Sequence, residues 1–186
     1  MCDLSPLFTA LTVAGALIIA SVAAIVVAQA ANAGVFTAAA APFAMAAAAA
    51  SAAAASVTLF TAGNRAEEFF ICVGSPDLCR TQLSELQFAL QGLASVLAVQ
   101  ALAAAAVAAV AWIPYAAQPA MQVIRYALMT QIGVVALVAK YAHDFLKCVE
   151  SLGARQIPHP LIVAAAAVLV IGLPLIYPSR RWVTPR

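Results

Sequence analysis

The stretch FTALTVAGALIIASVAAIVVAQAA, residues 8–31, contains no charged residue and decides the class of fold. It lies within a longer uncharged region that extends from Asp3 to Arg65. One membrane-spanning helix needs about 20 apolar residues, so this region is long enough for two. The turn-forming cluster Asn32-Ala33-Gly34 divides it. We therefore expect a helical hairpin of residues 8–31 and 35–61, with Gly63-Asn64 ending its second helix.

The composition of the whole chain supports the same conclusion. The chain has 186 residues, of which 66% are hydrophobic and 9% charged, whereas a soluble domain carries about 25% charged residues. The net charge of +2 gives no support for nucleic-acid binding. We expect an all-α, polytopic helical membrane protein, with residues 1–186 forming a single membrane domain whose partner is the lipid bilayer.

The remaining spans follow from the other apolar stretches. Residues 63–87 form a more polar segment, and Ser75-Pro76-Asp77 within it has the pattern of a helix start. Further spans are expected at about residues 88–113, 120–140 and 161–177. The sequence thus predicts about five transmembrane helices, beginning with an Ala-rich hairpin. The N-terminus, residues 63–87 and residues 140–160 would share one side of the membrane.

All four cysteines fall on that shared side: Cys2, Cys72, Cys79 and Cys148. The Arg180-Arg181 pair near the C-terminus has no acidic neighbour, which places this end in the cytoplasm and the cysteines in the periplasm. Disulfides persist in that compartment. Cys72 and Cys79 flank a Gly-Ser-Pro turn, so a Cys72–Cys79 disulfide is predicted. The alternative is four buried thiols that act as small apolar residues.

Polar residues recur at helical spacing inside two of the apolar stretches. One set lies on the expected third helix and the other on the fourth; together they are Ser84, Gln87, Gln91, Ser95, Gln118, Gln122 and Arg125. An amide facing lipid tails is costly, so these faces are expected to turn inward. They would either line a water-filled pore or form hydrogen bonds between helices. Arg125 would act as an interfacial anchor or as a cationic constriction.

No pattern of residues indicates an enzyme. The sequence contains no phosphate-binding loop, nucleophile elbow, zinc-helix signature or paired catalytic carboxylates. His143, Asp144 and Cys148 lack a recognised ligand spacing, so neither a metal nor another cofactor is expected.

The stretch AMAAAAASAAAAS, residues 44–56, is unusually poor in large apolar side chains. Small residues allow close helix–helix packing in a membrane. They also make this helix only weakly hydrophobic as an independent span. That property suits a protein that is shielded in water before it enters a membrane.

In this respect residues 8–61 resemble the hydrophobic hairpin of pore-forming colicins. The whole chain is similar in composition to the small membrane effectors that bacteria deliver by type VI secretion. The resemblance implies an antibacterial, pore-forming toxin that dissipates the membrane potential of a target cell's inner membrane by ion leakage. It also implies a secretion carrier or chaperone, a cognate immunity membrane protein and a homo-oligomer. The alternative is a resident accessory subunit of a bacterial membrane complex.

Overall fold

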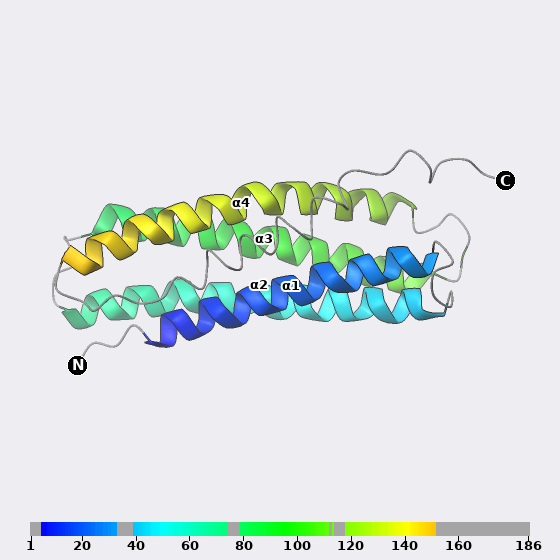
Figure 1. Cartoon of the computed structure of the whole chain (residues 1–186), viewed down its shortest axis with the longest axis horizontal. Coiled ribbons are helices and arrows are strands. Elements are labelled where there is room, and N and C mark those ends of the chain that lie inside the picture. The colour runs from blue at the N-terminus through cyan, green and yellow to red at the C-terminus, as the bar shows by residue number, and fades with distance from the viewer. Residues whose placement is uncertain (1–4, 33–38, 74–78, 112, 114–117, 152–186) are drawn as a thin grey trace.

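The computed structural model describes residues 5–32, 39–73, 79–111, 113 and 118–151. These residues form four helices, namely α1 (Ser5–Asn32), α2 (Ala40–Val73), α3 (Arg80–Val110) and α4 (Gln118–Ser151). The helices run up and down along one long axis (Figure 1). Each is long and apolar enough to cross a membrane. The predicted all-helical architecture is therefore confirmed for the described ranges, which contain four helices able to span a membrane. The predicted span at 161–177 lies outside them.

The interior of the bundle is built from one repeating pattern. Buried residues recur in alternating steps of four and three residues on every helix, which is the heptad pattern of left-handed helix packing. We call each such row a seam. The seams comprise Leu7, Leu11, Ala14, Ile18, Ser21, Ile25 and Ala28 on α1; Ala41, Met45, Ala48, Ala52, Ala55, Leu59, Ala62, Ala66 and Phe69 on α2; Leu86, Leu90, Leu93, Leu97, Gln100, Ala104 and Val107 on α3; and Ile124, Leu128, Gln131, Val135, Val138, Ala142, Phe145 and Val149 on α4.

The alanine-rich stretch has a clear structural role in this arrangement. Ala48, Ala52 and Ala55 are fully buried on the α2 seam. Close backbone contacts join α2 to both α1 and α3. Because alanine keeps the side-chain layer thin, it lets the backbones of neighbouring helices approach closely. The low hydrophobicity of α2 is thus compatible with a tightly packed position.

The predicted end of the second helix at Gly63-Asn64 is wrong. Helix α2 continues to Val73, because Ala62, Ala66 and Phe69 extend its buried seam beyond the glycine. A glycine inside a helix costs only about 1 kcal/mol, which this packing outweighs. Much of the predicted polar segment at residues 63–87 belongs to α2 and α3.

Helix α3 begins at Arg80. The residue that precedes the helix is Cys79, which adopts the left-handed conformation with φ of 64°. The predicted start at Ser75-Pro76-Asp77 lies outside the described residues.

The contacts between helices define which residues share a level along the bundle. The Gln87 Nε2 atom lies 3.4 Å from the Gly63 carbonyl oxygen. A Cβ added at Gly92 would lie 3.9 Å from Val134 Cγ1. Counting along these antiparallel helices places Arg65, Glu85 and Lys140 at one level. Followed from the opposite end of the bundle, this charged level is the first on α2 and α3, and on α4 it comes after Arg125.

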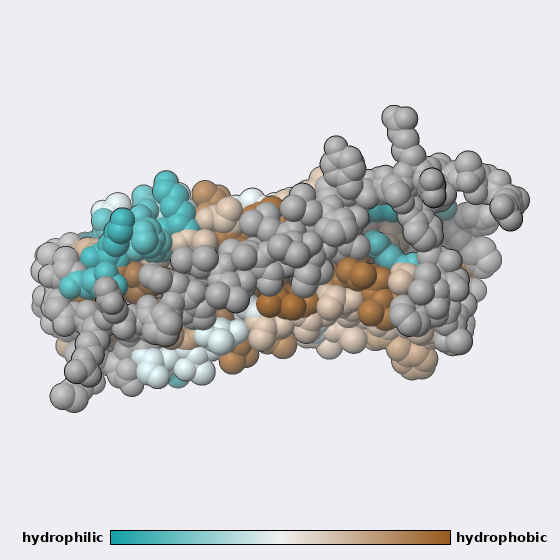
Figure 2. Space-filling model, viewed as in Figure 1, coloured by the Kyte–Doolittle hydropathy of each residue, from teal (hydrophilic) through white to brown (hydrophobic). Residues whose placement is uncertain are grey.

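Apart from Arg125 on α4, charge is segregated to one end of the described bundle. Beyond the charged level, the helices carry Glu67, Glu68, Arg80, Asp144, Lys147 and Glu150. Figure 2 shows hydrophilic residues gathered at the end where α4 finishes. In the other direction α3 extends from Glu85 to Val110, about 37 Å at 1.5 Å per residue. A hydrocarbon core of about 30 Å fits within that apolar band, which leaves the charged end outside the bilayer.

Candidate functional site

A buried hydrogen-bonded network joins three helices in the middle of the apolar band. Ser21 and Gln100 are both fully buried. The Ser21 hydroxyl donates to the Ala48 carbonyl at 3.1 Å, and Gln100 Nε2 donates to Ser21 Oγ at 3.1 Å. Because a serine hydroxyl has only one proton, this pattern fixes the orientation of the Gln100 amide. The network ties α1, α2 and α3 together.

Two further hydrogen bonds connect α2 with α3. The Ser56 hydroxyl donates to the Ala94 carbonyl at 2.9 Å and is buried. Gln87 Nε2 donates to the Gly63 carbonyl over a longer distance, 3.4 Å. The interpretation of polar residues as links between helices therefore applies to Gln87. Sequence reasoning missed Ser21 and Ser56; the position of Ser21 on a heptad seam is the signal that would have identified it.

The structure places most of the predicted pore-lining residues on the outside of the bundle. Gln87 is half-buried, and the exposed ones are Ser84, Gln91, Ser95, Gln118, Gln122 and Arg125. The expectation that these faces turn inward within one chain is wrong. The physical reason is the leucine seam of α3, which fills the interior and leaves the polar face of that helix on the opposite side. Their role in lining a pore stays a prediction.

These exposed residues are spread along the length of α3 and α4. The helix register places Ser84 at the charged level, and Gln91 and Ser95 in the half of the apolar band nearer that level. Thr130 lies level with Ser95, and α4 then supplies polar residues toward the other end of the bundle. We call this set the polar track and define it as Ser84, Gln91, Ser95, Thr130, Gln122 and Gln118.

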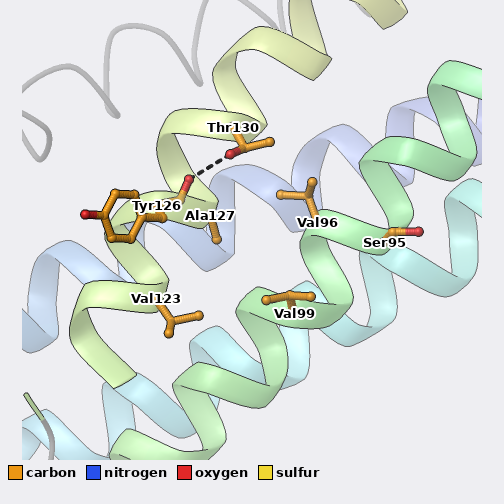
Figure 3. Close-up of a pocket in the computed structure, with 7 residues that line it drawn as sticks. All are labelled: Ser95, Val96, Val99, Val123, Tyr126, Ala127 and Thr130. Atoms are coloured by element: carbon orange, nitrogen blue, oxygen red, sulfur yellow. Dashed lines mark hydrogen bonds between the residues drawn. The ribbon is translucent and has the colours of Figure 1, made fainter. Parts of the chain in front are cut away.

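A shallow groove lies where the two halves of the polar track meet (Figure 3). It has a volume of about 320 Å³ and is lined by Ser95, Val96, Val99, Val123, Tyr126, Ala127 and Thr130. The Ser95 hydroxyl donates to the Gln91 carbonyl at 2.9 Å, and the Thr130 hydroxyl donates to the Tyr126 carbonyl at 3.0 Å. No hydrogen bond joins the Gln91, Gln118 or Gln122 side chain to another described residue. These three amides are therefore the unsatisfied groups of the track.

Arg125 occupies a position that suits an interfacial anchor. The register places it about 24 Å along the bundle from the charged level, close to the far edge of a 30 Å hydrocarbon core. Its side chain is exposed on the outside of the bundle. A guanidinium there can extend to the lipid headgroups. This geometry does not place it in a constriction inside the bundle.

The predicted Cys72–Cys79 disulfide is wrong. Cys79 is bonded instead to Cys148, with a Cα–Cα distance of 6.0 Å, which is within the normal range for a disulfide. The reason is the fold: the buried Cys79 immediately precedes α3 and lies beside the last turns of α4. Cys72 also belongs to a disulfide, so no described cysteine is a free thiol.

The charged end provides no candidate metal centre. No group of three or more His, Cys, Asp or Glu side chains could hold a metal ion among residues 5–32, 39–73, 79–111, 113 and 118–151. Cys148 is held in its disulfide. The candidate site is therefore the polar track together with the buried Ser21–Gln100 network.

The four apolar helices indicate a membrane location for the chain. Comparison with protein-family models, curated proteins and solved structures finds no match to the chain. A more particular assignment must therefore come from the geometry of its polar groups.

Proposed function

We propose that the chain is a membrane-inserting, pore-forming protein whose path lies between copies and is lined by the polar track. The observation that supports this proposal is the position of the track, outside a packed bundle and along the depth of its apolar band. Lipid tails offer no hydrogen-bond partner to the amides of Gln91 and Gln122. Water in a path between copies would satisfy both of them.

This proposal refines the antibacterial function expected from the sequence. Leakage of ions through such a path would dissipate the membrane potential of a target cell's inner membrane. The path carries amides and hydroxyls rather than rings of charge, which favours a small leak. Residues 161–177 would add a fifth span. A secretion carrier or chaperone would shield the chain in transit, and a cognate immunity membrane protein would protect the producing cell.

A second candidate function is supported by the same surface. Polar side chains on a lipid-facing helix can also bind the polar side chains of another protein's helix. In that case the chain would be a resident accessory subunit of a bacterial membrane complex. Ion leakage by the isolated protein distinguishes the two functions, because only a pore-forming protein would produce it.

The decisive test is reconstitution of the full-length protein into liposomes that hold a potassium gradient. A potential-sensitive dye should report collapse of the membrane potential with the wild-type protein. The double variant Gln91→Leu with Gln122→Leu should lower the leak roughly tenfold, because it removes polar groups that line the path. A tenfold loss corresponds to about 1.4 kcal/mol added to the barrier for ion passage. Insertion of this variant is expected to be unchanged, because leucine favours the membrane.

Gln29→Leu is the matched control for this experiment. Gln29 is a half-buried amide on α1, and the register places it level with Gln118 but outside the polar track. Its replacement should leave the leak unchanged. If wild-type protein inserts without any leak, the accessory-subunit function takes the place of the pore. If Gln29→Leu lowers the leak as much as the double variant does, the polar track is not the path.

A further inference from the structure

The bundle core contains polar atoms that no helix satisfies. Gln131 is fully buried, and neither its Nε2 nor its Oε1 atom has a hydrogen-bond partner. The Oε1 atom of Gln100 is likewise buried and unpartnered. Its orientation is fixed, because Gln100 donates its amide to Ser21 Oγ. Buried amide atoms are rarely left without a partner, since removing them from water is costly.

The geometry brings these atoms toward one region of the core. Val134 faces Gly92, so Gln131 is level with about residue 95 of α3. Gln100 lies about five residues further along, roughly 7.5 Å of helix rise. Side chains on a helix lean toward its N-terminus. Because α3 and α4 are antiparallel, the Gln100 side chain points along the bundle axis toward Gln131, and the Gln131 side chain points toward Gln100.

The chemistry of the unpartnered atoms selects the class of ligand. The two Oε1 atoms accept hydrogen bonds, and the Gln131 amide donates them. An anion would find only one donor group among these atoms, and a metal cation would find only two neutral oxygens. A water molecule can donate to both oxygens and accept from the amide. It therefore matches all three atoms.

One side of this region differs from the others in how its helices pack. Close backbone contacts join α1 to α2, α2 to α3 and α3 to α4. Among the described helices, α1 and α4 have no comparable contact. The α1–α4 side is thus the wider side of the bundle, and the Gln131 side chain lies on the seam of α4 that faces the core.

We propose that ordered water occupies the core between Gln100 and Gln131, forming a hydration site buried in the apolar band. The water completes the hydrogen bonding of both amides and connects α4 to the Ser21–Gln100 network. A polar group at a seam position also fixes the register of packed helices. This site is separate from the polar track, which lies outside the bundle, and it does not depend on ion leakage.

Water-edited solid-state NMR tests the site in full-length protein in lipid bilayers. Side-chain amides of glutamine are labelled with ¹⁵N, and the transfer of magnetisation from water to each amide is followed over milliseconds. The Gln100 and Gln131 amides should receive water magnetisation severalfold faster than the methyl groups of Leu97 and Val135. In Gln131→Leu, the transfer to Gln100 should be lost.

Gln131→Met repeats the test with a side chain of nearly the same shape, in case the leucine variant does not fold. Gln29→Leu is the control and should leave both buried signals unchanged. Absence of water transfer to Gln100 and Gln131 would overturn the proposal. So would unchanged transfer to Gln100 in both Gln131 variants, or a direct hydrogen bond between the two amides.

Discussion

Replacing Cys79 with Ser is expected to lower the free energy of unfolding by about 2–4 kcal/mol. The disulfide to Cys148 joins residues separated by 69 positions in the sequence. A closed loop of this length removes much conformational freedom from the unfolded chain. Denaturation of the detergent-solubilised protein, followed by circular dichroism, measures the loss.

Cys148→Ser and the double variant provide the controls for the disulfide. Each should be destabilised by about as much as Cys79→Ser, because all three changes remove the same bond. Losses that add in the double variant would contradict the pairing. Peptide mapping without reduction should also show Cys79 linked to Cys148 in the wild-type protein.

Ala52→Leu is expected to destabilise the bundle by about 1–3 kcal/mol, the usual cost of adding volume to a packed core. Ala52 is fully buried on the α2 seam. The added methyl groups would push α2 away from its neighbours, and the greater hydrophobicity would not compensate, since lipid is as apolar as leucine. Helix separation can be followed by energy transfer between labels on α1 and α2 during denaturation.

Ala53→Leu is the matched control, because Ala53 is the next residue along α2 and is exposed. It adds the same hydrophobic volume at a position that faces lipid. We expect its stability to equal that of the wild-type protein. An equal loss in both variants would mean that the alanines do not serve close packing.

The class of fold could be predicted from the sequence because membrane insertion depends on local composition. The uncharged residues between Asp3 and Arg65 were sufficient to predict a helical hairpin, and α1 and α2 form one. The end of α2 could not be predicted in the same way. Gly63 favours a helix end locally, but the helix continues because Ala66 and Phe69 find neighbours in the folded bundle.

The sequence was sufficient to find the residues of the polar track, but not to predict whether their side chains face the other helices or the outside of the bundle. Helical spacing shows that Ser84, Gln91 and Ser95 share a face of α3, yet it does not show which face meets the other helices. In a chain that is 66% hydrophobic, the opposite face is apolar too, and its leucine seam became the interior. The Cys79–Cys148 pairing depends similarly on residues brought together only by the fold.

The hydrogen bonds between helices have a consequence for how this sequence tolerates change. Ser21, Ser56 and Gln87 each donate to a main-chain carbonyl, at Ala48, Ala94 and Gly63 respectively. Every amino acid carries such a carbonyl, so the accepting positions can be replaced by any residue small enough to fit. The donating positions have no such freedom. Mutations should therefore accumulate unequally on the two sides of each bond. The donating position must keep its polar side chain, whereas the accepting position must only keep a small residue.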